Sequence, residues 1–155
     1  MLKKTVSHVN LRLLFLPKNN HWLKRIALVF SFISFDYFST LIFCRAPNEE
    51  ANLLARTFME NAGVPLGLTL FVLSVNLPIY VILSLDSNMI RLPNRIATPV
   101  EVGVDLVFAW FIAGLHFSGG TSWFWYAPEF VRQMFGAIIY LSLAIMIVKR
   151  CRKCE

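Results

Sequence analysis

The chain has 155 residues, of which 57% are hydrophobic and only 15% charged, whereas soluble domains average about half apolar and a quarter charged. This excess of apolar residues excludes a disordered chain, a collagen-like fibre and a disulfide-rich secreted module, and it disfavours a soluble globule. The net charge of +6 is carried mostly by basic residues that flank apolar blocks, so it indicates membrane orientation rather than nucleic-acid binding.

The first segment, residues 1–25, mixes basic side chains with apolar residues at Leu2, Val6, Val9, Leu13 and Leu16. Its short apolar run is interrupted by Arg12 and no small-residue cleavage site follows it, so a secretory signal peptide is not predicted. We expect an amphipathic segment that lies at the cytoplasmic membrane surface.

Four apolar blocks predict four transmembrane helices, at about 26–44, 64–85, 99–117 and 130–148. A hydrocarbon core of about 30 Å requires about 20 helical residues, which each block supplies or approaches. The predicted fold is therefore an all-α polytopic membrane protein. It has one transmembrane domain, residues 26–148, followed by a basic cytoplasmic tail, residues 149–155.

The first predicted span carries Asp36 and Thr40, which are one helical turn apart on the same face. A charged residue near the middle of a bilayer costs about 2.5–3.5 kcal/mol on insertion scales, so it normally faces protein or water. Asp36 lies roughly 15 Å from the inner end of its span. Both residues are candidate site residues, and hydrogen bonding between helices is the structural alternative.

A short helix at the outer membrane surface is predicted between the first and second spans. Pro47 and Asn48 end the first span, Glu49 and Glu50 suit the first turn of a new helix, and Gly63 ends that helix. Polar side chains at this face of the membrane form a second group of candidate site residues: Glu50, Asn52, Arg56 and His116.

The second and third predicted spans add polar residues at a depth close to that of Asp36. Asn76 lies roughly 14 Å, and Asp105 roughly 9 Å, from the inner end of its span. Glu101 and Asp105 are one turn apart, so one carboxyl group is expected to be protonated or a cation to lie between them. His116 follows three turns after Asp105 and is expected on the same stripe of the helix. Glu101 near the inner surface and His116 near the outer end also suit purely structural positions.

A glycine turn at Gly119 and Gly120 is predicted to follow the third span. Trp123, Trp125 and Tyr126 come directly after it, and their rings are typical of an aromatic belt at the depth of the lipid head groups. Cation binding or stacking on a ligand is the alternative role for these three rings.

The three cysteines predict no framework of disulfide bonds. Cys44 lies in an apolar run and is expected to be a small core residue. Cys151 and Cys154 lie among four basic residues at the end of the chain, where either palmitoylation or no role is expected, because one such pair lacks two of the ligands of a zinc site.

The distribution of basic residues predicts the orientation in the membrane. Twelve of the fifteen Lys and Arg residues lie in segments 1–25, 86–98 and 149–155, which four spans would place on one side. Since positively charged segments stay in the cytoplasm, both termini are predicted to be cytoplasmic, and the protein is expected to be a multi-pass protein of the cell membrane.

Two short motifs resemble a known family. The sequence DYFST at 36–40, followed after a short turn by EANLL at 50–54, is similar to a pattern of small prokaryotic integral membrane domains: D-x-x-x-T, then G-x-x-E-x-N-P-L. Pro47 stands where that pattern has glycine, and Leu53 where it has proline. The family has no assigned function, so the resemblance implies four helices and no particular chemistry. It marks as characteristic the polar residues Asp36, Thr40, Glu50 and Asn52.

Three functional hypotheses follow from these residues. The favoured one is a non-enzymatic membrane protein whose polar layer, Asp36, Asn76 and Asp105, binds a cation or proton or holds helices in register. The second is a membrane-embedded enzyme that acts on a lipid head group or a peptide at the outer face, with the outer-face residues meeting around a metal or a head group. The third is an accessory subunit of a larger membrane complex.

The expected partners are the lipid bilayer and either further copies of the chain or a larger membrane complex. No nucleic acid is expected, because most of the basic residues flank apolar blocks and are explained by membrane orientation. No cofactor is predicted either, since the sequence has no phosphate-binding loop, no zinc-protease motif and no serine nucleophile motif.

Overall fold

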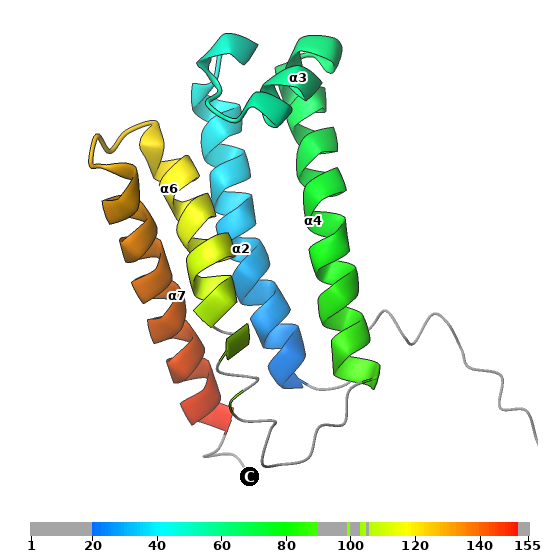
Figure 1. The fold of residues 1–155 in the computed structure, drawn as a ribbon, viewed down its shortest axis with the longest axis vertical. Helices are drawn as coiled ribbons and strands as arrows, with labels where there is room; N and C mark the ends of the chain where they lie inside the picture. The colour runs from blue at the N-terminus through cyan, green and yellow to red at the C-terminus, as the bar shows by residue number, and fades with distance from the viewer. Residues whose placement is uncertain (1–19, 90–98, 100–102, 105, 152–155) are drawn as a thin grey trace, which may run out of the picture.

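A long helix, α2 (Asn20–Phe43), lies at the centre of the molecule (Figure 1). The computed structural model describes residues 20–89, 99, 103–104 and 106–151. The predictions made for residues 1–19, Glu101, Asp105 and Cys154 lie outside these residues, as does the side chain of Cys151.

Further helical elements with established bounds follow α2 in the described part of the chain. They are the 3-10 turn η1 (Pro47–Glu49), α3 (Leu53–Ala62), α4 (Val64–Met89), the π-helical segment η2 (Phe108–Gly114), α6 (Leu115–Ser122) and α7 (Glu129–Cys151). All regular structure in the described part of the chain is helical, which confirms the predicted all-α class.

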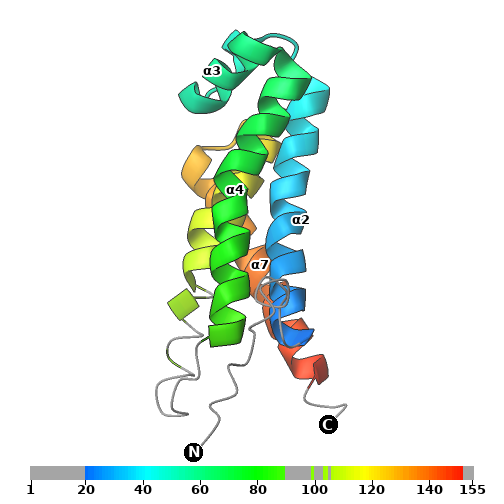
Figure 2. The ribbon, with the colours of Figure 1, turned by 90° about the vertical axis from the view of Figure 1, so that its right-hand side faces the viewer.

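The helices pack around α2 in two groups. On one side α2 contacts α4, and α3 lies across the end of α4; on the other side α2 contacts α6, η2 and α7 (Figures 1 and 2). The larger core is formed between α2, η2 and α7 by Val29, Phe32, Ile33, Ala109, Ala113, Ala137 and Tyr140. A smaller core joins the ends of α2, α3 and α4 and contains Cys44, Met59 and Leu68, which confirms the predicted core position of Cys44.

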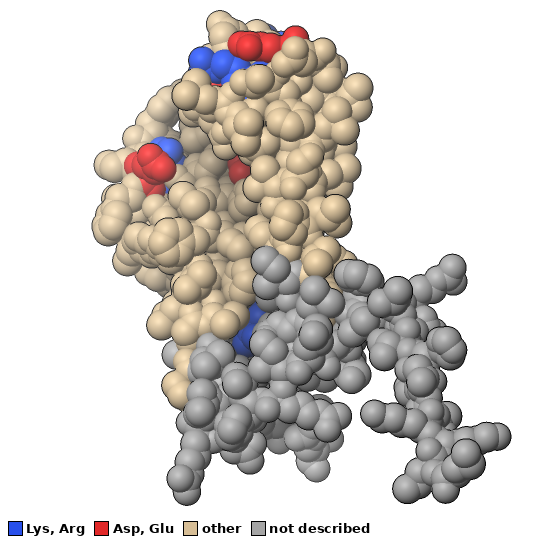
Figure 3. Space-filling view, turned by 45° about the vertical axis from the view of Figure 1, so that its right-hand side comes forward, with Lys and Arg blue, Asp and Glu red and all other residues tan. Residues whose placement is uncertain are grey.

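Among the residues that the structure describes, three helices are long and apolar enough to cross a membrane: Leu23–Phe43, Val64–Val81 and Glu129–Met146. Large apolar side chains on their outer surfaces are exposed, among them Leu66, Leu70, Leu73 and Leu77 along α4. Figure 3 shows a face of the molecule that is uncharged over most of its area, with acidic and basic groups at the α3 end and at the turn between α6 and α7, and a basic group at the opposite end. These features are typical of a membrane protein.

The observed helices extend beyond the predicted spans. α2 begins at Asn20 rather than at residue 26, and the helix includes Lys24, whose side chain is exposed, and Arg25, which is only 6% exposed. α4 begins at Val64 as predicted, but it continues to Met89. The described part of the third predicted span is formed by η2 and α6, and α6 ends only at Ser122.

Gly119 and Gly120 were expected to form a turn, and this expectation is wrong because both residues lie inside α6. A Cβ added to Gly119 would lie 2.7 Å from Asp36 Oδ1, and one added to Gly120 would lie 2.7 Å from Phe35 Cε1. The two glycines therefore allow α6 to approach α2 closely, as small residues do between membrane helices.

Candidate functional site

A pocket of about 820 Å³ lies between α4 and α6, with α2 at its base and the η1–α3 connection at one end. It forms because α4 packs against α2 and α3, whereas α6 packs against α2 and α7. We call it the central pocket. Figure 3 shows the molecule hollowed beside α4, with acidic atoms visible inside the hollow.

The central pocket changes from polar to apolar along the helix axes. Towards the α3 end, polar side chains line it: Asp36, Thr40, Glu49, Glu50, Asn52, His116, Ser118, Ser122, Glu129 and Arg132. Further from that end the lining is mostly apolar: Ile33, Phe71, Val72, Val75, Ile79, Phe111, Ile112 and Leu115. The pocket is therefore amphipathic along the bundle axis, with its polar end at α3 and its apolar part further from α3.

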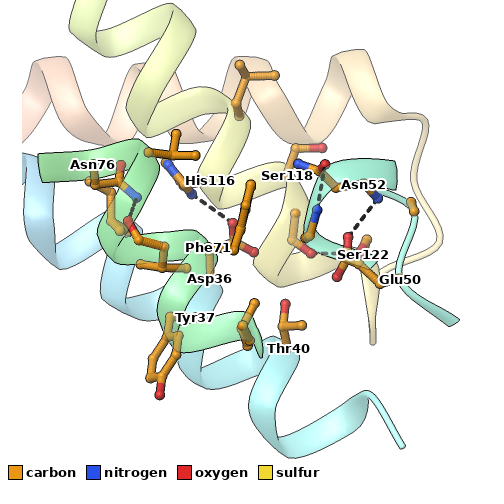
Figure 4. Close-up of a pocket in the computed structure, with 18 of the residues that line it drawn as sticks. Asp36, Tyr37, Thr40, Glu50, Asn52, Phe71, Asn76, His116, Ser118 and Ser122 are labelled. Atoms are coloured by element: carbon orange, nitrogen blue, oxygen red, sulfur yellow. Dashed lines mark hydrogen bonds and ion pairs between the residues drawn. The ribbon is translucent and has the colours of Figure 1, made fainter. Parts of the chain in front are cut away.

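The most distinctive contact in the pocket joins Asp36 of α2 to His116 of α6. The distance between His116 Nδ1 and Asp36 Oδ2 is 2.7 Å, and each side chain is 24% exposed. Figure 4 shows the two side chains pointing toward one another. A carboxylate that accepts a hydrogen bond from Nδ1–H fixes the orientation of the imidazole ring, as in sites where histidine transfers protons or holds a charge.

Glu50 and Asn52 are held at the polar end of the pocket by local hydrogen bonds. Glu50 Oε1 accepts from the backbone N–H of Asn52 at 2.8 Å, and Asn52 Oδ1 caps α3 by accepting from Leu54 N–H at 3.0 Å and Ala55 N–H at 3.2 Å. The guanidinium of Arg56 donates to the backbone oxygen of Glu50 through Nε and a terminal nitrogen. Arg56 thus holds the connection in place.

The Glu50 carboxyl has a perturbed acidity. Burial raises its pKa above the usual value of 4.5, and the nearby Asp36 carboxylate raises it further, against the lowering effect of the hydrogen bond from Asn52. The influence of Asp36 means that the two acids interact across the pocket.

Thr40 and Asn76 complete the inner wall. Thr40 Oγ1 accepts a hydrogen bond from Trp123 Nε1 at 3.2 Å, so Trp123 lies against α2 and lines the pocket. Asn76 Nδ2 donates to Val72 O at 2.8 Å, which fixes the orientation of the amide. Within the described residues nothing donates to its buried Oδ1.

Arg132 joins the start of α7 to the end of α6. Its Nε donates to the backbone oxygen of Ser118 at 3.2 Å, and one terminal nitrogen donates to the backbone oxygens of Trp125 and Ala127. One guanidinium group therefore binds one carbonyl group of α6 and two of the α6–α7 connection, which holds the start of α7 against the end of α6.

The structure brings together most of the predicted site residues. Asp36, Thr40, Glu50, Asn52, Asn76 and His116 line the same pocket, although they were predicted as two separate groups. Arg56 is adjacent and acts through the backbone of Glu50. Glu101 and Asp105 lie outside the described residues.

The stripe predicted to connect Asp105 with His116 assumed continuous α-helix between them. The π-helical segment η2 lies in this interval, and its wider turn changes the phase of the helix before His116. Gln133 Nε2 of α7 donates to the backbone oxygen of Trp110 at 3.2 Å, within η2. The face on which His116 lies is thus set by η2 and its contacts.

Trp123, Glu129 and Arg132 line the pocket and were not among the predicted site residues. Trp123 was expected, with Trp125 and Tyr126, in an aromatic belt, with cation binding or stacking on a ligand as the alternative. Tyr126 is 94% exposed, whereas Trp123 donates a hydrogen bond to Thr40. For Arg132, the sequence offered one signal: an arginine close to the start of the fourth apolar block is unusual, because membrane helices carry few charges.

Among the residues that the structure describes, no group of three or more His, Cys, Asp or Glu side chains is arranged to hold a metal ion.

Comparisons with models of protein families, with curated proteins and with solved structures give no match for this chain. The four polar residues of the motif resemblance all line the central pocket: Asp36, Thr40, Glu50 and Asn52. Function is therefore inferred from the pocket itself.

Proposed function

We propose that the protein is a multi-pass protein of the cell membrane with four spans, both termini in the cytoplasm and α3 at the outer surface. Three helices of sufficient length and hydropathy support the first, second and fourth spans of this arrangement, and η2 with α6 would form the outer part of the third span. Twelve of the fifteen basic residues would then lie on the cytoplasmic side.

In this arrangement the central pocket binds an amphipathic, lipid-like molecule. The observation that carries this proposal is the Asp36–His116 pair, set in an amphipathic pocket open enough to leave each side chain 24% exposed. A lipid-like ligand would place its polar head near the pair and its chain along the apolar wall formed by α4 and η2. Ligand sites of this size are usually lined by apolar groups with a few placed polar ones.

Blocking the apolar wall tests the proposal. Val75 lines the pocket, whereas Leu73, two residues earlier on α4, is 61% exposed and lies outside it. The protein is purified in a mild non-ionic detergent, and co-purified lipid is measured by native mass spectrometry. We expect Val75→Trp to lose bound amphiphile and Leu73→Trp to retain it. Equal occupancy in the two variants would refute binding in the central pocket.

Catalysis on the head group is a second candidate function of the same site, and the hydrogen bond that orients His116 toward Asp36 favours it. His116 would then act as a general base. Ser118 and Ser122 hydroxyls donate to backbone oxygens of Glu129 and Gly119, so the nucleophile would be water. Release of head groups from labelled lipids by the wild type, lost in His116→Ala while lipid still binds, is the expected result; no release by the wild type rejects this candidate.

A further inference from the structure

We infer that the central pocket selects amphiphiles whose polar head carries an ammonium group. This inference rests on the proposed binding function and specifies its ligand. It is argued from the balance of charges in the pocket, from an acceptor that has no donor, and from the aromatic rings near both.

Acidic groups outnumber basic ones in the lining of the pocket. Asp36, Glu49, Glu50 and Glu129 contribute carboxyl groups, and Arg132 contributes the guanidinium. Low-dielectric walls strengthen the field of charges that line a cleft, so a pocket with this lining attracts cations. An excess of negative groups in the pocket agrees with the hypothesis, made from the sequence, that the polar layer binds a cation.

The basic groups of the pocket already serve acceptors of the protein. Arg132 donates to three backbone oxygens, and His116 contributes its Nδ1 to the contact with Asp36. An anionic head group would compete with these acceptors and would lie close to carboxylates. A cationic head group meets neither penalty.

Asn76 provides independent evidence for a donor in the ligand. The residue is only 3% exposed, and its Oδ1 has no hydrogen-bond partner within the described part of the chain. The bond from Nδ2 to Val72 O fixes the amide so that Oδ1 must remain the free acceptor. A buried acceptor without a donor is unfavourable, and an ammonium group has three N–H donors to offer.

Aromatic rings line the pocket between its polar and apolar parts. Trp123 lies beside Thr40, and Phe71 lies on the α4 wall, and Figure 4 shows Phe71 together with Asp36, Asn76 and His116. Ring faces attract ammonium groups and also accept hydrocarbon, so these residues suit the junction between a cationic head and its chain.

The inference is tested with single-chain probes of equal length. Wild-type protein in nanodiscs of zwitterionic lipid is titrated with tetradecylammonium, tetradecanol and tetradecyl sulfate, and binding is followed by native mass spectrometry. We expect the ammonium probe to bind about tenfold or more tightly than the alcohol, as for one hydrogen bond involving a charged group, and the sulfate to bind weakest. Butylammonium, which lacks the long chain, should bind far more weakly than tetradecylammonium.

Matched variants localise the preference. Asp36→Asn and Asn76→Leu should each lower the ammonium-to-alcohol affinity ratio, whereas Glu60→Gln and Asn61→Leu should leave it unchanged. Glu60 is an exposed acid of α3, and Asn61 makes the same side-chain bond as Asn76, from Nδ2 to the backbone oxygen of Thr57, on the exposed surface. Asn76→Leu removes an unsatisfied buried acceptor, so the variant is expected to fold.

The outcomes separate the two proposals. Equal binding of the alcohol and the ammonium probe, or preferred binding of the sulfate, would overturn ammonium selectivity while the pocket remained an amphiphile site. If none of the three long-chain probes binds, both proposals fail. A ratio that is lowered equally by Glu60→Gln and by Asp36→Asn would overturn the assignment to this pocket.

Discussion

Replacing Gly119 by alanine tests the contact between α6 and α2 that positions the Asp36–His116 pair. The new Cβ would lie 2.7 Å from Asp36 Oδ1, about 0.7 Å closer than an ordinary van der Waals contact of about 3.4 Å, and 3.0 Å from Oδ2. Either α6 moves away from α2 or the carboxylate turns and weakens its 2.7 Å contact with His116. Overpacking of this kind costs about 1–3 kcal/mol.

Helix propensity acts in the opposite direction, because alanine is favoured over glycine in a helix by up to about 1 kcal/mol. We therefore expect Gly119→Ala to be destabilised by about 1–2 kcal/mol, which lowers the Tm of a chain of this size by roughly 2–8 °C. Gly103 provides the matched control, since a Cβ at this exposed position would meet nothing within 4 Å. Gly103→Ala should be neutral or slightly stabilising.

Thermal unfolding of both variants is measured by far-UV circular dichroism in the same detergent. A second test combines Gly119→Ala with Asp36→Ala, which removes the clashing carboxylate, so the double variant should recover part of the lost stability. The close approach of α6 to Asp36 would be refuted if Gly119→Ala were as stable as Gly103→Ala, or if the two substitutions at the contact were strictly additive.

Two further predictions concern the connection at the polar end of the pocket. Because the pKa of Glu50 is raised, its carboxyl group stays protonated in the folded state at pH values where it is ionised in the unfolded chain. The stability gained in this way is fully present below pH 4.5 and is lost as the pH rises through the pKa of the folded state. The Tm of the wild type should therefore fall relative to that of Glu50→Gln as pH increases. A Tm difference between these two proteins that stays constant with pH would contradict this prediction. So would an equal fall of the wild-type Tm relative to that of the control variant Glu60→Gln. Asn52→Ala should lose about 1 kcal/mol with the cap of α3, whereas Asn52→Asp should keep most of it; equal Tm values for the two would contradict the capping role.

The helices were predictable because apolar blocks of sufficient length can satisfy their backbone groups in a membrane only as helices. Their ends were less predictable, since Lys24 and Arg25 interrupt the apolar block without interrupting the helix. The pair Gly119 and Gly120 was misread as a turn because glycine is equally favoured where two helices approach closely. Nothing in a single sequence distinguishes these two uses.

The site was predictable in its members but not in its pairing. Asp36 is costly in a membrane helix wherever it lies, so its importance follows from the sequence. Its partner, however, is 80 residues away in the chain, and the side of the helix that His116 occupies depends on the π-helical segment η2. A π-helix interrupts the 3.6-residue period on which every stripe argument rests.

The way in which α2 is joined to its neighbours bears on the purpose of the Asp36–His116 pair. Tyr37 of α2 shares a 2.9 Å hydrogen bond with Thr69 of α4, and Trp123 donates to Thr40 at 3.2 Å, so neutral groups already join α2 to both sides of the pocket. A contact between ionisable groups must recover the hydration that those groups lose, so it is a weaker means of holding helices together than well-packed neutral side chains. Asp36 nevertheless lies between two neutral contacts and faces the pocket, and Gly119 remains small to make room for it. The pair is therefore better explained by what it offers to a ligand in the pocket than by what it contributes to the fold.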